Sequence, residues 1–364
     1  MSSPITVLVS PGQALAVLLA ASGIRAARAV RQAQARAEAL HGEHAQERLA
    51  AGALQAGAHE QGLAALQAQA DAAEERLAQL AALSARLGGG QTLQAARPAR
   101  PEGADYAALA DYARATEAFA ADARRVLMTA LAGQPQGGEG EPGGLTLPAA
   151  LASHEPASTA SARLLRRIAH LGPPPADIQA LAEELDRTAA DGSRAELLAS
   201  ELRRRVQLHA EDALRDEVRR AQALVVEQSL QDLGYQVEEI ESTLFVEGGV
   251  AHFRKSHWGD YMVRMRVERG GGSINFNVVR AVDADQVEGQ ASVQDHLAED
   301  RWCAEFPALR QALEARGLPL QVTRRLEAGE LPVQRVARER LPRFAGDEAG
   351  MTAAAPQLMA RPLP

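Results

Sequence analysis

Reactive side chains are concentrated in residues 251–267, which read AHFRKSHWGDYMVRMRV and include Lys255, the only lysine of the chain. His252, His257 and Asp260 belong to the residue types that bind transition metals. However, His257 and Asp260 fall at a turn and His252 falls in mid-strand, so their convergence would need a special geometry. No second cluster of cysteine and histidine supports a zinc site, and we expect neither a metal ligand nor a cofactor.

A second group of reactive residues has helical spacing, because Glu299, Asp300 and Cys303 follow His296 by three, four and seven positions. An exposed helix shoulder with one half-buried thiol is the more common origin of such a pattern. The chain contains no G-x-S-x-G elbow, P-loop, dinucleotide fingerprint or H-E-x-x-H motif. Because no nucleophile has an identifiable base and orienting group, we expect no catalytic residue and a protein that is not an enzyme.

Alternation with a period of two divides this region between the two faces of a sheet. One face is apolar and is formed by Ala251, Phe253, Tyr261, Val263, Met265 and Val267, with Ile274, Phe276 and Val278 as counterparts. The opposite face carries the polar residues His252, Arg254, Arg264, Arg266, Asn275 and Asn277.

The polar face has two interpretations. The simpler one is the solvent side of a half-buried sheet. The second is a basic platform for an anion, a nucleic-acid backbone or an acidic partner surface, because arginine, asparagine and backbone donors are the groups that contact phosphate. On the second interpretation the platform binds a partner, and Trp258, at the turn between two strands, is an additional anchor.

The elements that position this face form a predicted α+β domain over residues 234–336. Alternating runs predict strands at 235–240, 243–247, 250–255, 259–267, 273–280 and 319–325. The short connections among the first five predict an antiparallel meander. A helix over 291–316 would cover the sheet with one apolar stripe, formed by Trp302, Phe306, Leu309 and Leu313.

The N-terminal part of the chain is predicted to be a long helix, because residues 11–87 are rich in good helix formers and lack any further proline. Gaps of three and four separate the apolar and small residues near its end, which is the signature of a coiled coil. These positions are Leu63, Leu66, Ala70, Ala73, Leu77, Leu80, Ser84 and Leu87. Four glycines between residues 41 and 62 predict a bend or break. We expect self-association through this coiled coil.

A second amphipathic helix is predicted over residues 104–132, returning antiparallel onto the first. Its stripe consists of Leu109, Tyr112, Thr116, Phe119, Ala123, Val126 and Ala130. Further helices are predicted at 158–171, from an Asp177 cap to 190, and at 193–233. The chain therefore divides into a long N-terminal helix or coiled coil (1–90), a linker and second helix (91–132), a flexible low-complexity linker (133–157), a helical coiled-coil segment (158–233), the α+β domain (234–336) and a disordered tail (337–364).

Residues 4–24 carry no charge over about one membrane-spanning length. A membrane anchor is therefore an alternative to a soluble N-terminus. Against an anchor, Ser10, Pro11 and Gln13 resemble a helix start, which would divide the run into a short ITVLV strand and an alanine-rich helix. Cys303 is the only cysteine, which fits a reducing compartment. We expect a cytoplasmic protein, with N-terminal membrane anchoring as the alternative.

The bulk composition limits the function. Aromatic residues make up 3% of the chain and none precedes Tyr106, so the first hundred residues lack the side chains that usually fill a globular core. A net charge of −8 argues against a general nucleic-acid binder. The sequence predicts a mostly α-helical, non-enzymatic coiled-coil scaffold or adaptor whose C-terminal α+β domain docks a macromolecular partner, most simply a protein. The alternative is an accessory nucleic-acid-binding protein of a DNA-processing or defence machine.

Overall fold

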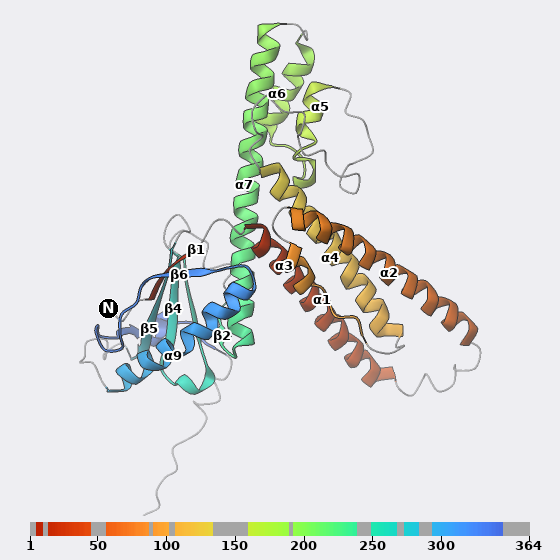
Figure 1. Cartoon of the computed structure of the whole chain (residues 1–364). Coiled ribbons are helices and arrows are strands. Elements are labelled where there is room, and N and C mark those ends of the chain that lie inside the picture. The colour runs from red at the N-terminus through yellow and green to blue at the C-terminus, as the bar shows by residue number, and fades with distance from the viewer. Residues whose placement is uncertain are drawn as a thin grey trace, which may run out of the picture. The chain divides into compact units, whose positions relative to one another are not determined.

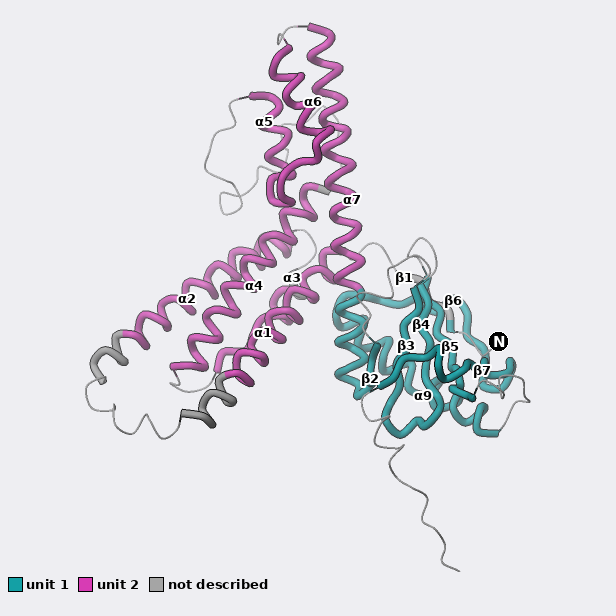
Figure 2. Tube along the Cα trace, turned by 180° about the vertical axis from the view of Figure 1, so that it is seen from behind, with its two compact units in different colours: residues 1–11, 223–364 teal, residues 12–222 magenta. Residues whose placement is uncertain are grey.

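The computed structural model describes residues 5–9, 14–44, 56–86, 90–101, 106–133, 159–188, 192–238, 249–267, 273–283 and 293–344. The chain divides into two units (Figure 2): unit 1 comprises residues 1–11 and 223–364, and unit 2 comprises residues 12–222. The predicted combination of a mostly helical chain with a C-terminal sheet and helix is confirmed. One finding departs from a division into consecutive segments, because the N-terminal strand belongs to the same unit as the C-terminal sheet.

Unit 2 consists of helices. They are α1 (Ala14–His44), α2 (Ala56–Arg86), α3 (Gly90–Ala95), α4 (Tyr106–Gly133), α5 (Ala160–Leu165), the 3-10 turn η3 (Ala169–Leu171), α6 (Ala176–Arg187) and the first three quarters of α7 (Ser193–Asp232). The described residues place the end of α1 and the start of α2 inside the predicted break at 41–62, and residues 45–55 lie outside the described part. The predicted linker after α2 contains the short helix α3, whose Leu93 is buried.

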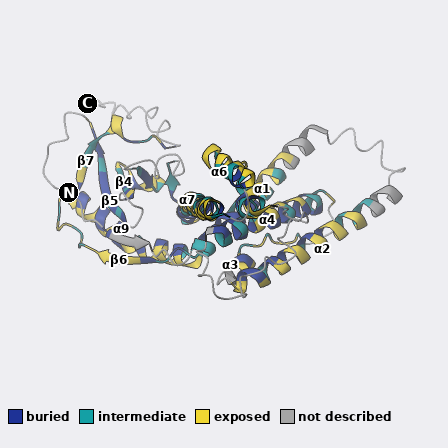
Figure 3. Cartoon of the chain, turned by 90° about the horizontal axis from the view of Figure 1, so that it is seen from above, coloured by how far each residue is buried: buried dark blue, intermediate teal, exposed yellow. Residues whose placement is uncertain are grey.

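Six of the seven residues of the stripe predicted on α4 are buried and Ala130 is half-buried, because α4 packs against both α1 and α2. Its Leu109, Tyr112 and Ala113 form one cluster with Ala70 of α2. Figure 3 shows the resulting separation of buried and exposed residues along α2 and α4. This part of the predicted heptad repeat on α2 therefore packs within the chain.

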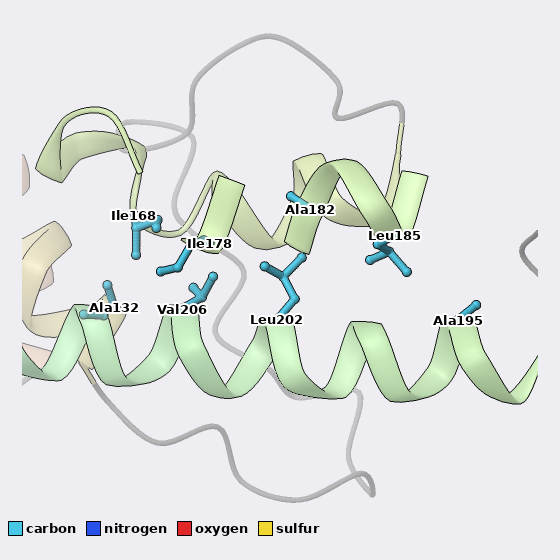
Figure 4. Packing of buried hydrophobic residues seen from close by; sticks show 9 residues of the cluster. Ala132, Ile168, Ile178, Ala182, Leu185, Ala195, Leu202 and Val206 are labelled. Carbon is cyan, nitrogen blue, oxygen red and sulfur yellow. The ribbon is translucent and has the colours of Figure 1, made fainter. Parts of the chain in front are cut away.

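A second core of unit 2 joins α6 and α7 (Figure 4). Ile178, Ala182 and Leu185 of α6 point toward Leu202 and Val206 of α7. The prediction that Asp177 caps α6 was wrong, because Pro175 occupies the N-cap position and no side chain caps it. Asp177 lies in the first turn instead and pairs with Arg205 at 2.6 Å. The helix predicted at 158–171 is divided into α5 and η3.

Unit 1 contains a mixed sheet covered by one helix (Figure 1). Its described elements are β1 (Ile5–Val9), β2 (Gln236–Val237), β3 (Val250–Arg254), the 3-10 turn η4 (Ser256–Trp258), β4 (Tyr261–Val267), β5 (Ser273–Val282), α9 (Val293–Ala315), β6 (Leu320–Arg324), β7 (Gln334–Ala337) and the 3-10 turn η6 (Arg338–Arg340). The strand order is β2-β3-β4-β5-β1-β6, and β7 also pairs with β5. The strand predicted at 243–247 lies outside the described residues.

Two strands explain why the sheet is not the simple antiparallel one that we predicted. The strand ITVLV forms as predicted, but it inserts between β5 and β6, with Ile5 opposite Phe276. β7, which we did not predict, runs parallel to β5, with Val279 opposite Gln334. Within the sheet, β3, β4 and β5 pair antiparallel in chain order.

The predicted apolar face of the sheet packs against α9. Trp302, Phe306, Leu309 and Leu313 of α9 are all buried, as their spacing predicted. The aromatic rings of Phe253, Phe276 and Trp302 form the centre of this core, with ring centroids between 5.5 and 6.5 Å apart.

The opposite face of the sheet is partly covered as well. Leu341 and Phe344 are buried in a cluster with Met262, Val279 and Ala281. Residues 338–344, which we expected to belong to an unfolded tail, therefore form part of the fold. Their apolar side chains cover the apolar end of a face that we had treated as polar throughout.

None of the helices in the described part of the chain combines the length and the apolar character that a membrane span requires. The predicted start of α1 at Ser10, Pro11 and Gln13 lies outside the described residues.

Candidate partner-binding face

Strand register brings four of the predicted partner-binding residues together. Arg264 lies opposite Asn277, and Arg266 lies opposite Asn275, on the neighbouring strands β4 and β5. Residues two apart on a strand project from the same side. These four residues therefore form one continuous patch, which we call the arginine face: Arg264, Arg266, Asn275 and Asn277.

The arginine face carries positive charge, and its contacts among the described residues are with neutral groups. The Arg264 guanidinium is half-buried and donates to Oε1 of Gln334 at 2.5 Å, a neutral acceptor. Burial and then the repulsion of Arg266 lower the pKa of Arg264. Within the described ranges, neither arginine forms an ion pair with a carboxylate. The face is therefore electrostatically suited to an incoming anionic group.

His252 does not belong to the accessible part of this face, although it lies opposite Arg264. Its side chain is buried, and its Nδ1 lies 3.1 Å from Oε2 of Glu238, which also accepts from the His252 backbone N–H. Burial lowers the pKa of His252, and Glu238 only partly opposes that effect. Our assignment of His252 to partner binding is corrected, because its ring is occupied by an internal contact.

Arg254 and Trp258 are also engaged inside unit 1. Nη1 of Arg254 donates to the Gly259 carbonyl oxygen at 3.2 Å, and its guanidinium lies 5.0 Å from the centroid of the Phe344 ring. Trp258 is only 4% exposed and meets the Tyr235 ring edge-on at 5.9 Å. We expected Trp258 as an exposed anchor, and this expectation was wrong because η4 turns the indole inward, into the aromatic core.

The remaining reactive residues of the stretch 251–267 do not converge. His257 is exposed, and Asp260 pairs with Arg338 at 2.7 Å. The described residues contain no group of three or more histidines, cysteines and carboxylates that could hold a metal ion. Nζ of Lys255 pairs with Glu305 at 2.7 Å and lies 4.7 Å from the centroid of the Tyr235 ring.

The group of reactive residues on α9 does not converge on one site either. Oε2 of Glu299 is buried and accepts from the Gly329 backbone N–H at 2.7 Å, whereas His296 and Asp300 are exposed. Cys303 is buried, and burial raises the pKa of its thiol. A thiol in that state is a poor nucleophile.

Asp295 is one of the buried polar residues that the sequence-based search missed. Asp295 of α9 is 3% exposed and accepts from the Tyr261 hydroxyl at 2.6 Å. Nη1 of Arg280 lies 3.4 Å from the same carboxylate oxygen. Asp295 lies seven residues before Trp302, on the apolar stripe of α9. A carboxylate at a position that faces the core could have indicated a buried polar contact. The group joins α9 to β4 and β5.

Comparison of the chain with protein-family models, with curated proteins and with solved structures gives no match.

Proposed function

We propose that this protein is a non-enzymatic scaffold or adaptor whose C-terminal α+β unit docks an acidic protein surface on the arginine face. One observation carries the proposal: Arg264 is half-buried beside Arg266, and the described residues offer neither of them a carboxylate. Charge-assisted hydrogen bonds that the two arginines donate to a partner carboxylate would offset both the desolvation and the repulsion. Arg266 and the two asparagines add further donors on the same face.

Two other arginines of the chain differ from Arg264 in their partners, whereas Arg167 resembles it in donating to the neutral Ala132 carbonyl and Gln207 amide oxygens. Arg125 pairs with Asp122 and Glu217, and Arg280 pairs with Asp295. Half-buried arginines in these places have carboxylate partners from their own chain. Among the described residues the arginine face has no such carboxylate, and the proposal is that another molecule supplies it.

The extent of the face favours a protein partner over nucleic acid. The apolar end of this side of the sheet is occupied by Leu341 and Phe344, and Glu238 adds a carboxylate beside His252. What remains is a patch centred on two arginines, whereas a groove that follows a nucleic-acid backbone neutralises several phosphates.

The helical unit supplies the scaffold part of the proposal. Coiled-coil pairing through the α2 repeat, which we predicted from the sequence, would have to compete with the packing of Ala70 on α4. A cytoplasmic location is part of the same proposal and is supported by the single buried thiol of Cys303.

Affinity capture with the full-length chain tests the docking role. The test variant is Arg264→Glu with Arg266→Glu, and the matched control is Arg301→Glu with Arg310→Glu, two exposed arginines of α9. Both variants change the net charge equally. We expect captured partners to be lost from the test variant, to be retained by the control and to elute at raised salt. Equal recovery from the test variant and the wild type would refute the docking role.

The nucleic-acid alternative is separated by a direct binding measurement. Fluorescence anisotropy with labelled single- and double-stranded DNA and RNA at low salt gives no binding if the partner is a protein. Salt-sensitive binding that only the Arg264→Glu, Arg266→Glu variant loses would replace our proposal with that alternative.

A further inference from the structure

A second surface, on α7 in unit 2, carries a heptad pattern that faces away from the core. Its positions are separated by three, four, three, four and three residues, and we call them the α7 stripe: Arg194, Leu197, Glu201, Arg204, Leu208 and Glu211. Leu197 is 72% exposed and Leu208 is 44% exposed. Residues with this spacing lie along one side of a helix.

The opposite side of the same helix is fully used. Ala195, Leu202 and Val206 are buried in the cluster with α6 (Figure 4), and Ala210 belongs to the same cluster. The core therefore accounts for one face of α7 and leaves the two exposed leucines of the stripe unexplained. Two exposed leucines at d and a spacing on the outer face of a helix that is already packed are compatible with pairing to another helix.

The stripe is complementary to itself in one orientation only. Consider a second copy of α7 running antiparallel, with the two-fold axis between Leu202 and Arg203. Leu197 then meets Leu208 of the second copy, Glu201 meets Arg204, and Arg194 meets Glu211. Each contact joins an a position to a d position, as in an antiparallel coiled coil, and each charged contact joins opposite signs.

In a parallel, in-register pair the same residues would repel one another. Glu201 would face the second Glu201, and Arg204 would face the second Arg204. Like charges at such positions are destabilising. We infer that two copies of this protein associate through an antiparallel pairing of their α7 stripes. This inference does not depend on the docking role of the arginine face.

Existing contacts of the stripe residues do not prevent this pairing. Arg194 pairs with Glu184 at 2.6 Å and Arg204 pairs with Glu201 at 2.7 Å, and all four side chains are substantially exposed. Exposed ion pairs of this kind contribute little to stability, so they exchange readily for contacts across the interface. Arg205 flanks the axis, and Asp177 neutralises it from α6.

The interface is small. The stripe spans 18 residues of sequence, or about 27 Å of helix at 1.5 Å per residue. Leucine occupies only the 197 and 208 positions, and charged side chains occupy the rest. Such an interface belongs with weak, transient associations. We therefore expect a dimer whose population rises with protein concentration.

Sedimentation velocity of the full-length chain tests the association. The average mass should rise from 38.6 kDa toward twice that value as the concentration increases. Leu197→Glu with Leu208→Glu should abolish the rise. Val293→Glu with Leu297→Glu, at exposed positions of unit 1, is the matched control and should leave the rise unchanged. Both substitutions are at exposed sites, and circular dichroism should show unchanged helix content.

Cysteine cross-linking tests the orientation. A mixture of Leu197→Cys and Leu208→Cys proteins should form a mixed disulfide dimer. Either variant alone should not cross-link, because its two thiols would lie about 16 Å apart along the antiparallel helices. The wild type is the background control, since its Cys303 is buried.

Charge exchange sharpens the same test. Glu201→Arg should weaken association at least tenfold, because Arg204 of the second copy then faces an arginine. Adding Arg204→Glu should restore it. A monomer at every concentration, or a mass rise that the Leu197→Glu, Leu208→Glu variant retains, would overturn the inference. Efficient cross-linking of a single cysteine variant with itself would overturn the antiparallel register.

Discussion

The cores of the two units contain different proportions of aromatic and small side chains. In unit 1, the aromatic rings of Phe253, Phe276, Trp302 and Phe306 pack against one another. The ring centroids of Trp302 and Phe306, for example, are 5.7 Å apart. Aromatic side chains bury a large apolar area each and prefer such edge-on arrangements. A few large aromatic residues therefore form the centre of the core beneath the sheet.

In unit 2, small residues occupy many of the buried positions of the helices, beside large ones such as Leu18, Phe119 and Leu127. Ala70, Ala73, Ala113, Ala123 and Ser22 are completely buried. Small side chains contribute little apolar area individually, but they allow helix backbones to approach closely.

Polar contacts also have a larger part in unit 2. Asp122 of α4 accepts from Arg25 of α1 at 2.5 Å and from Arg125 at 2.6 Å, and Arg125 also reaches Glu217 of α7 at 2.9 Å. This network joins three helices.

The difference shows how one alanine- and arginine-rich chain obtains two kinds of stability. Unit 1 depends on aromatic side-chain volume, and unit 2 combines aliphatic burial with close approach of its helices and with compensated charge. Both tryptophans lie in unit 1, so tryptophan fluorescence reports on that unit, and far-ultraviolet circular dichroism reports mainly on the helices. The two units can therefore be followed separately in one unfolding experiment.

The largest expected effect is at Trp302. Trp302→Ala should lower the free energy of unfolding of unit 1 by about 3–5 kcal/mol, because it leaves a cavity in the aromatic core. Trp302→Phe should cost much less, since it keeps a ring and removes an indole N–H that finds no acceptor among the described residues. Urea unfolding followed by the fluorescence of Trp258 measures both. If the two variants were equally destabilised, ring volume would not be the main source of stability.

The next effect tests close approach in unit 2. A Cβ atom on Gly23 of α1 would lie 2.4 Å from Cβ and 2.6 Å from the backbone oxygen of Ala96. Gly23→Ala should therefore destabilise unit 2 by about 1–3 kcal/mol, although alanine is the better helix former. Thermal unfolding followed by circular dichroism measures the change. Gly192→Ala is the control, because nothing lies within 4 Å of its Cβ position. A gain in stability at Gly23 would contradict the close approach of α1 and Ala96.

The charged network of unit 2 predicts a smaller, pH-dependent effect. Burial alone would raise the pKa of Asp122, but hydrogen bonds from Ser22, Arg25 and Arg125 outweigh it, so the pKa lies below the ordinary value of 3.8. Asp122→Asn should cost about 2 kcal/mol at neutral pH.

The sign of the pH dependence follows from the lowered pKa. A carboxyl group with a lower pKa in the folded state stabilises above its unfolded value and loses that contribution as pH falls through the folded value. The difference between Asp122→Asn and wild type should thus be constant above about pH 5 and should shrink below about pH 4. Asp212→Asn, at an exposed ion pair, is the control and should show no comparable difference. If the stability difference between Asp122→Asn and wild type did not change with pH, the ionised Asp122 carboxylate would not contribute to the stability of unit 2.

Local periodicity predicted the parts of this fold that are local. The two faces of β3, β4 and β5, the buried stripe of α9 and the limits of α7 all follow from residue spacing. The partners of β1 could not be predicted in this way, because β1 pairs with strands from the opposite end of the chain.

The candidate site was predicted in part for a similar reason. Period two placed Arg264 and Arg266 on one face, and the register confirms that they share it with Asn275 and Asn277. It could not show that Leu341 and Phe344 return to cover the same side. Met262, Val279 and Ala281 gave a signal that we did not use, since apolar residues on a polar face require a cover.

The smallest effect concerns Lys255, the residue whose rarity first suggested a site. Its ammonium pairs with Glu305 and lies over the Tyr235 ring, at the edge of the aromatic core. Lys255→Met should lower the stability of unit 1 by about 1 kcal/mol, the usual size of a partly exposed ion pair with a cation–π contact.

A double-mutant cycle with Glu305→Gln, followed by tryptophan fluorescence, isolates the contribution of the pair. We expect a coupling of about 1 kcal/mol or less, because the Tyr235 hydroxyl also donates to Glu305 and remains in every variant. A coupling well above that would mean that unit 1, like unit 2, depends on compensated charge. The contrast between the two cores would then be one of degree, because ion pairs would anchor the aromatic cluster as they anchor the alanine-lined helices.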